Sequence, residues 1–538
     1  MIAPALVPLP QLVTADGDPG SPLGLPSALR VAVPSEELRG LGTAVADLLA
    51  KLHGIEPAVQ IGGAGDLTLV RSAGPVDGVE SVQGIDPLAR SDGDARERYE
   101  LSVGDRGAVV TACAPEGLFR GATTFAQLLQ ADAAGGITVP RVRIADGPAL
   151  AWRGLSLDVV RRFFTVAQVK KVIDLLALYK FNVLHLHLSD SQAWRLRIDA
   201  WPRLTDPAHW PAGELTAGED GLPYYTQDDY REIVAYAAAR YVTVVPELDM
   251  PGHVLAAVRA YPELQGGKET PHRLLAYLDP EAEAAQRFVR EVLAEVAALT
   301  PGPYLHIGGD EAFGMPDELY AAFTARALEI ARGTGKKVVG WQETARSGAL
   351  APADVAQAWI GAGDEFDLAA ARERTPAEYH GLLESMAAAF AQAERDVPAA
   401  VAAGVPVLAS PSSFLYLDRR YAEDSLHPGQ NERRTTVGHD SYPVRTCREL
   451  FAWRPGELPE IPAGARIAGV EAALWCESVG DFDDLAFLLL PRLAGIAEKA
   501  WTPPATEWDD HRARVARHPG WWERLGLDGY YRSAEVFG

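Results

Sequence analysis

Short apolar or β-branched runs alternate with helical stretches from Trp152 onwards, and this alternation limits the possible folds more than any other feature. One helical stretch follows Thr165, where apolar residues recur every three or four positions at Val166, Val169, Ile173 and Leu176. The candidate strands occupy residues 153–159, 181–188, 241–248, 304–308, 337–343, 355–360, 405–410 and 467–475. Eight successive strand-then-helix units predict an α/β fold, the (β/α)8 TIM barrel.

The chain is too long for a barrel alone. Its 538 residues exceed what one hydrophobic core usually organises. Residues 1–147 mix short β-like runs with loops and one helical stretch, which predicts a small α+β domain. We therefore expect this domain, a catalytic barrel at 148–505 and a helical tail at 506–538 packed on the barrel. The segment 363–404 is longer than a barrel loop needs and predicts an inserted helix or two.

Charge and cysteine content exclude several classes of function. The formal charge of −23 and the pI near 5.0 argue against a nucleic-acid partner, which needs a basic surface. Cys113, Cys447 and Cys476 are too few and too scattered for a disulfide framework. The N-terminus does not read as a signal peptide, and no apolar run is long enough to span a bilayer. These features predict a cytoplasmic protein without a membrane or nucleic-acid partner, unless a leader has been removed.

A TIM barrel carries its active-site residues at the C-terminal ends of its strands. Polar and aromatic residues gather at those positions in this sequence. They are His187, Asp190, Glu247, Asp249, Asp310, Glu311, Gln342, Glu343, Trp359 and Trp475. The clustering predicts one polar site at that face of the barrel.

The sharpest local motif is YLHIGGDEAF at 304–313, an apolar run that ends in two glycines and two adjacent carboxylates. Neighbouring side chains on a regular strand point to opposite faces. Asp310 and Glu311 can therefore share a pocket only if the strand has ended by Gly308 or Gly309. The alternative to a catalytic pair is a solvated acidic turn.

Two further segments favour the catalytic interpretation. His185 and His187 share one face of a strand and are followed by Asp190, while a second strand leads through Glu247 to His253. Each histidine alone is typical of a hydrogen-bonded structural residue. Together they predict a polar shell around a central site.

Five motifs then occur in the order typical of glycoside hydrolase family 20, the β-N-acetylhexosaminidases, which this sequence resembles. They are WRGLSLDVVRRFF, HLHLSDSQAWR, PELDMPGH, HIGGDE and LWCE, and the resemblance spans roughly residues 80–505. It implies exo-acting hydrolysis of terminal non-reducing β-linked GlcNAc or GalNAc from an oligosaccharide or glycoconjugate, with no cofactor and no metal. Chitin fragments, glycan termini, muropeptides and glycolipids all stay open as natural substrates, as does the oligomeric state.

The resemblance also implies a role for each matching residue. Glu311 is expected to be the general acid/base, and Asp310 to orient the substrate's own acetamido group as nucleophile, which gives an oxazolinium intermediate and net retention. Tyr416 is expected to donate to the acetamido oxygen. Substrate contacts are expected from Arg153, Trp341, Trp359, Asp418, Trp475 and Glu477, and support behind the acid from Asp190 and His253.

Two rival functions remain on sequence grounds. A metal-dependent amidohydrolase could use His185 and His187 with His253 or His306 as zinc ligands. That reading leaves the tryptophans and the GGDE turn unexplained. A non-catalytic sugar-binding protein would need the tryptophans but not Glu311.

Overall fold

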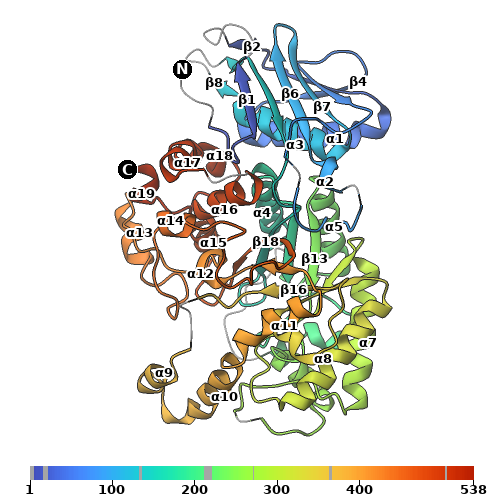
Figure 1. The fold of residues 1–538 in the computed structure, drawn as a ribbon, viewed down its shortest axis with the longest axis vertical. Coiled ribbons are helices and arrows are strands. Elements are labelled where there is room, and N and C mark those ends of the chain that lie inside the picture. Colours follow the sequence, from blue (N-terminus) through green and yellow to red (C-terminus); the bar gives the residue numbers. More distant parts are fainter. Residues whose placement is uncertain are drawn as a thin grey trace.

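The computed structural model describes residues 5–15, 22–80, 82–91, 93–131, 136–210, 221–270, 272–362, 366–502 and 506–538. Figure 1 shows a small sheet-containing domain above a larger barrel, with the C-terminal helices beside the place where the two meet. No helix in the described part of the chain is long and apolar enough to cross a membrane.

The larger body is a closed barrel of eight parallel strands in sequence order. The strands are β11 (Trp152–Asp158), β12 (Val183–His187), β13 (Thr243–Glu247), β14 (Tyr304–His306), β15 (Lys337–Trp341), β16 (Val355–Ala358), β17 (Val407–Ala409) and β18 (Ile467–Leu474). Every residue of β11 is buried, as expected for a parallel strand covered on both faces. The predicted TIM barrel and the position of each predicted strand are confirmed.

Helices surround the barrel, and one of them lies where the apolar spacing after Thr165 predicts it. The main ones are α4 (Val166–Leu178), α5 (Gln227–Ala238), α7 (Glu283–Leu299), α8 (Asp317–Gly333), α15 (Phe482–Leu489) and α16 (Arg492–Trp501). Helix α4 begins with a capping box, in which the Gln168 N–H donates to Thr165 Oγ1 (3.2 Å) and the Thr165 N–H donates to Gln168 Oε1 (2.9 Å). Thr165 is therefore the N-cap of the predicted helix that follows it.

The described part of the long segment after β16 includes the α-helices α9 (Leu368–Arg374), α10 (His380–Phe390) and α11 (Asp396–Ala402). Helices α9 and α10 lie at the lower left of Figure 1, away from the body of the barrel. Helix α11 returns to the barrel, where Arg346 forms a bidentate ion pair with Asp396 at 2.6 and 2.8 Å. The insertion therefore has a fixed base.

The N-terminal domain is built on a mixed seven-stranded sheet in the order β1-β10-β6-β7-β5-β3-β4. Its strands are β1 (Leu12–Ala15), β3 (Arg30–Val33), β4 (Ala58–Ile61), β5 (Leu67–Arg71), β6 (Tyr99–Gly104), β7 (Gly107–Ala112) and β10 (Val142–Asp146). Helices α1 (Arg39–His53) and α3 (Pro115–Leu128) pack against this sheet and against each other. A separate three-stranded sheet joins β2 (Leu23–Leu25), β9 (Ile137–Val139) and β8 (Gln130–Ala131).

The end of the chain forms short helices, α17 (Trp508–Val515), α18 (Pro519–Arg524) and α19 (Ala534–Phe537). They hold the barrel and the beginning of the chain together. Arg514 pairs with the buried Glu498 of α16 at 2.7 Å, and His518 contacts the Ala5 carbonyl at 2.7 Å and the Tyr179 hydroxyl at 2.9 Å.

Buried ion pairs join the N-terminal domain to the N-terminal end of the barrel strands. The Glu97 carboxylate accepts from Arg153 at 2.7 and 2.8 Å and from Arg120 at 2.8 Å. Burial alone would raise the pKa of Glu97, but the two arginines outweigh it and hold the pKa below its usual value. Lys180 pairs with Asp146 in the same region at 3.0 Å.

Replacing Glu97 by alanine should destabilise the protein by about 3–5 kcal/mol, because Arg153 and Arg120 would stay buried without their shared partner. A lower midpoint of thermal unfolding would reveal this. Glu36→Ala is the control, since Glu36 and Arg39 form an ion pair that is exposed on both sides. An unchanged midpoint for Glu97→Ala would contradict the structural importance of this cluster.

Candidate active site

A cavity of about 430 Å³ opens beside the C-terminal ends of the barrel strands. Most of the site residues expected from the sequence line it. They are Asp190, His253, Asp310, Glu311, Trp359, Tyr416, Asp418, Trp475 and Glu477. Segments far apart in the sequence thus meet in one pocket, as the barrel predicts.

The turn after β14 brings Asp310 and Glu311 into this pocket. The strand ends at His306, and Gly308 and Gly309 adopt φ angles of 67° and 107°. A Cβ on Gly308 would lie 1.7 Å from Asp249 Oδ1, so only glycine fits there. Glu311 itself has a backbone φ of 46°, which is rare for any residue other than glycine. The prediction that the strand ends before the carboxylate pair is confirmed.

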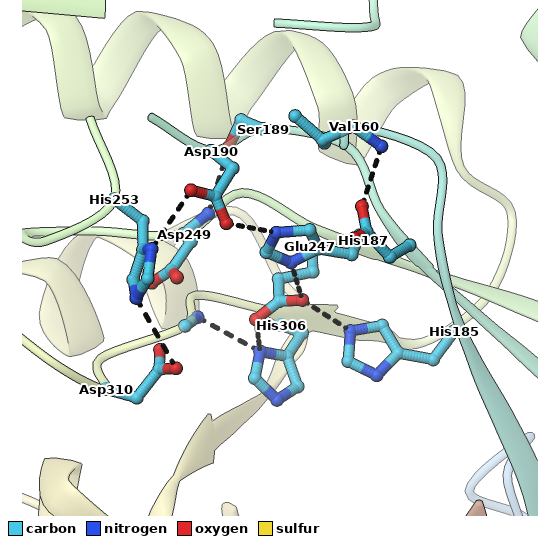
Figure 2. Close-up of polar contacts among 12 residues, drawn as sticks. Val160, His185, His187, Ser189, Asp190, Glu247, Asp249, His253, His306 and Asp310 are labelled. Carbon is cyan, nitrogen blue, oxygen red and sulfur yellow. Dashed lines mark hydrogen bonds and ion pairs between the residues drawn. The ribbon is translucent and has the colours of Figure 1, made fainter. Parts of the chain in front are cut away.

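His253 stands between the two carboxylates and Asp190. Its Nδ1 lies 3.0 Å from Asp190 Oδ1, while its Nε2 lies 3.4 Å from Glu311 Oε2 and 3.8 Å from Asp310 Oδ2. Figure 2 shows this imidazole between Asp190 and Asp310. Burial alone would lower the pKa of His253, but the surrounding carboxylates, Asp190 first, raise it well above its usual value.

The electrostatics of Asp310 follow from its buried position. Burial raises its pKa to about 6, with Glu311 acting in the same direction and His253 against it. Its Oδ1 has no hydrogen-bond partner among the described residues. Asp310 is therefore a carboxylate that is ionised at neutral pH and lacks a partner for one buried oxygen.

Glu247 lies at the centre of the polar network below the cavity. Its carboxylate is 3.1 Å from His185 Nε2, 2.5 Å from His187 Nδ1 and 3.2 Å from His306 Nδ1 (Figure 2). It also accepts from the Trp341 indole at 2.7 Å. Burial would raise the pKa of Glu247, but the three histidines hold it well below its usual range. The polar shell expected around the central site is present.

Three groups of described residues place potential metal-ligand atoms within 4.8 Å of one another. They are His185 with Glu247 and His306, Asp190 with Asp249 and His253, and Glu247 with Asp249 and Asp310. Both ring nitrogens of His185 and of His187 already lie within hydrogen-bond distance of carboxylates. A zinc site of the amidohydrolase kind would have to break these contacts, so the arrangement favours a hydrogen-bonded network.

Aromatic side chains form one side of the pocket. The Trp359 ring stacks on Tyr416 with centroids 6.3 Å apart and an interplanar angle of 11°, and Trp475 lies 6.1 Å from Tyr416. The Trp359 indole donates to Glu343 at 3.1 and 3.2 Å, which fixes its orientation. Trp341 lies behind Trp475, with centroids 5.9 Å apart, and is not among the residues that line the cavity.

Three charged residues, Asp418, Glu477 and Arg161, also line the cavity, and the Arg161 guanidinium lies over the Trp475 ring at 5.2 Å from its centroid. Both carboxylate oxygens of Asp418 are buried without a hydrogen-bond partner among the described residues. Burial and the neighbouring Glu477 raise the pKa of Asp418 to about 8. Arg161 pairs with Asp190 at 2.6 Å and lies 3.7 Å from Glu477. These groups can bind several hydroxyls.

The expectation that Arg153 contacts the substrate is wrong. Arg153 is the second residue of β11 and therefore lies at the N-terminal end of the barrel, opposite the cavity, where it binds Glu97 and the Leu150 carbonyl. Arg161 follows the C-terminal end of the same strand and lines the pocket. The strand-end rule, applied to RGLSLDVVRRFF, would have favoured Arg161.

Other lining residues were not identified from the sequence. His439, Ser441 and Tyr442 come from the connection between β17 and β18, and Phe366, Arg374, Met386 and Phe390 come from the insertion. They lie on long connections whose paths the strand pattern does not determine, so no sequence signal pointed to them.

Comparison with known proteins agrees with this geometry. The family model of the glycosyl hydrolase family 20 catalytic domain matches residues 150–377 and 383–504, and that of the family's domain 2 matches residues 3–147. A β-N-acetylhexosaminidase of Cellulomonas fimi is 36% identical over 97% of this chain and 96% of its own length. The Streptomyces plicatus N-acetyl-β-hexosaminidase in complex with Thio-NAglucal superposes with a TM-score of 0.78 at 34% identity, over 99% of this chain and 97% of that chain. The family 20 β-N-acetylhexosaminidase of Streptomyces coelicolor A3(2) gives a TM-score of 0.77 at 34% identity, over 99% and 98%. The chain therefore belongs to glycosyl hydrolase family 20.

Proposed function

We propose that this glycoside hydrolase, a β-N-acetylhexosaminidase, removes terminal non-reducing β-linked GlcNAc or GalNAc residues with net retention of configuration. The observation that carries the proposal is the placement of Asp310 and Glu311 side by side in a cavity, with His253 within 4 Å of both. One carboxyl group can deliver a proton while the other stays ionised.

Glu311 acts as the general acid and then as the general base. It protonates the glycosidic oxygen as the bond to the anomeric carbon breaks, and it later takes a proton from the water that attacks the same carbon. His253, held by Asp190, positions the Glu311 carboxyl group through its Nε2. The backbone at Glu311 adopts a strained, positive φ angle, and the Glu311 side chain lines the cavity.

Asp310 orients the substrate's acetamido group so that this group acts as the nucleophile. Its unpartnered oxygen accepts the acetamido N–H, which turns the acetamido carbonyl oxygen towards the anomeric carbon. That oxygen attacks as the leaving group departs, and the product is a cyclic oxazolinium ion. Burial raises the pKa of Tyr416 well above its usual value, so its hydroxyl stays protonated and can donate to the acetamido oxygen.

The exo mode of action is supported by the polar groups that can bind the hydroxyls of a terminal sugar. Asp418 presents two unpartnered buried oxygens, and Glu477 and Arg161 lie close to it along the cavity wall. These groups bind the hydroxyls of a terminal sugar ring, while Trp359 and Trp475 contact its apolar parts. A ring whose hydroxyls are all bound in this way would carry no further sugar on its non-reducing side.

Replacing Glu311 by glutamine should lower turnover about 100- to 10,000-fold for glycosides with poor leaving groups, because the proton donor is lost. Activated aryl glycosides need little protonation and should lose much less. Steady-state kcat on an oligosaccharide and on a dinitrophenyl glycoside measures the difference. Equal losses on the two substrates would rule out Glu311 as the acid.

The wild-type enzyme should lose kcat/KM as the pH falls through about 6, because Asp310 must be ionised to accept the acetamido N–H. Asp310→Asn should lack this acidic limb and lose roughly 100- to 1,000-fold in kcat, as is usual when one preorganised hydrogen-bonding group is removed. Asp228→Asn is the control, since the Asp228 side chain is 93% exposed on α5. A limb near pH 6 that persists in Asp310→Asn would show that another group controls it.

A further inference from the structure

The cavity has a second wall, which the barrel strands do not provide. Phe366, Asp367, Ala371, Arg374, Met386 and Phe390 line it from the α9–α10 segment, here called the hairpin wall. The family model is interrupted between residues 377 and 383, within this wall. The break covers residues 378–382 alone, and the six lining residues fall within the matched ranges.

A continuous series of aromatic rings connects the hairpin wall to the catalytic turn. Phe390 lies 5.9 Å from Trp359 and 6.5 Å from Phe313, which follows Glu311 by two positions. Phe366 stacks on Phe390 with centroids 5.8 Å apart and an interplanar angle of 12°. Both phenylalanines are only half-buried, so they offer an apolar surface to a ligand that extends from the catalytic turn.

The C-terminal end of the wall is tied to the barrel, because Arg346 donates to the Ala389 carbonyl of α10 at 3.3 Å. Helix α11 follows the hairpin directly and is tied to the segment after β15 by the Arg346–Asp396 ion pair. Gln342, in that same segment, also donates to the Ala393 carbonyl at 3.4 Å. The wall is therefore linked to the strand next to the catalytic turn.

The hairpin wall also adds an arginine to a cavity whose other ionisable lining residues are mainly carboxylates and histidines. Of the two arginines that line the cavity, Arg161 is neutralised by ion pairs with Asp158, Asp190 and Glu477. Arg374 is exposed, and its Nε donates to the Ala370 carbonyl of its own helix at 3.2 Å. Asp367 nearby caps α9 by accepting from the Ala370 N–H at 3.0 Å.

We propose that the hairpin wall is the binding site for the leaving group, and that it favours a leaving group with an apolar face next to an anionic substituent such as a carboxylate. The apolar face rests on Phe366 and Phe390, and Arg374 binds the anion. The inference rests on the proposed function, because a leaving group exists only if the glycosidic bond is cleaved beside Glu311. The terminal sugar occupies the side of Asp418 and Glu477, which leaves the hairpin wall for the rest of the substrate.

An exposed arginine contributes modestly to binding, so we expect a two- to fivefold effect. The test compares p-nitrophenyl β-GlcNAc with the corresponding nitrophenyl glycoside that carries a carboxylate on its ring. In Arg374→Gln, the ratio of kcat/KM for the carboxylated substrate to that for the neutral one should fall two- to fivefold relative to the wild type. The difference should shrink at 1 M salt, because salt screens exposed charges.

Arg372→Gln provides the matched control, since Arg372 lies on the same helix but pairs with Glu384 and does not line the cavity. Its substrate ratio should equal that of the wild type. An unchanged ratio in Arg374→Gln, or an equal fall in both variants, would overturn the inference. Failure of the wild type to cleave the neutral p-nitrophenyl substrate would instead overturn the proposed function, so the two failures can be told apart.

Discussion

The ionised carboxylate of Glu247, buried at the centre of the barrel, is the group around which the site is organised. An unpaired charge at this depth would be very costly, and the protein stabilises it with three histidines and the Trp341 indole. These partners come from β12, β14 and β15, on either side of the strand that carries Glu247. Because each partner compensates part of the buried charge, the network holds these strands in their relative positions.

The same network extends outward to the catalytic turn. His187 contacts Glu247 through one ring nitrogen and Asp190 through the other, and Asp190 in turn holds His253. His253 then reaches Glu311 and Asp310. The orientation of the proposed acid therefore depends on a continuous series of buried contacts that begins at the barrel centre. The glycines of the turn add a further contact, because they allow the backbone to approach Asp249 closely.

Much of this arrangement could be predicted from the sequence because it depends on local pattern. Buried parallel strands are continuous apolar runs, and the GGDE string marks the end of one strand by its glycines. Arg153 shows where such reasoning fails. The motif alone does not say which of its arginines lies at which end of the strand, and the partner of Arg153, Glu97, belongs to another domain. The expectation that Trp341 contacts the substrate fails for a similar reason. A position at a strand end does not reveal whether a side chain faces the cavity or the network below it. The hairpin wall could be predicted only as inserted helix, because its contacts with Trp359 and Phe313 are tertiary.

The central claim is that the substrate's acetamido oxygen, and no carboxylate of the protein, attacks the anomeric carbon. Progressive fluorination of the acetyl methyl in p-nitrophenyl β-GlcNAc tests it most directly, because each fluorine makes that oxygen a weaker nucleophile without changing the leaving group. The account predicts that kcat falls steeply and in order from the acetyl to the mono-, di- and trifluoroacetyl substrates, and that the corresponding β-glucoside is cleaved at a negligible rate. A kcat that is insensitive to fluorination, with β-glucoside cleavage at a comparable rate, would contradict it and would point to a covalent intermediate on a protein carboxylate.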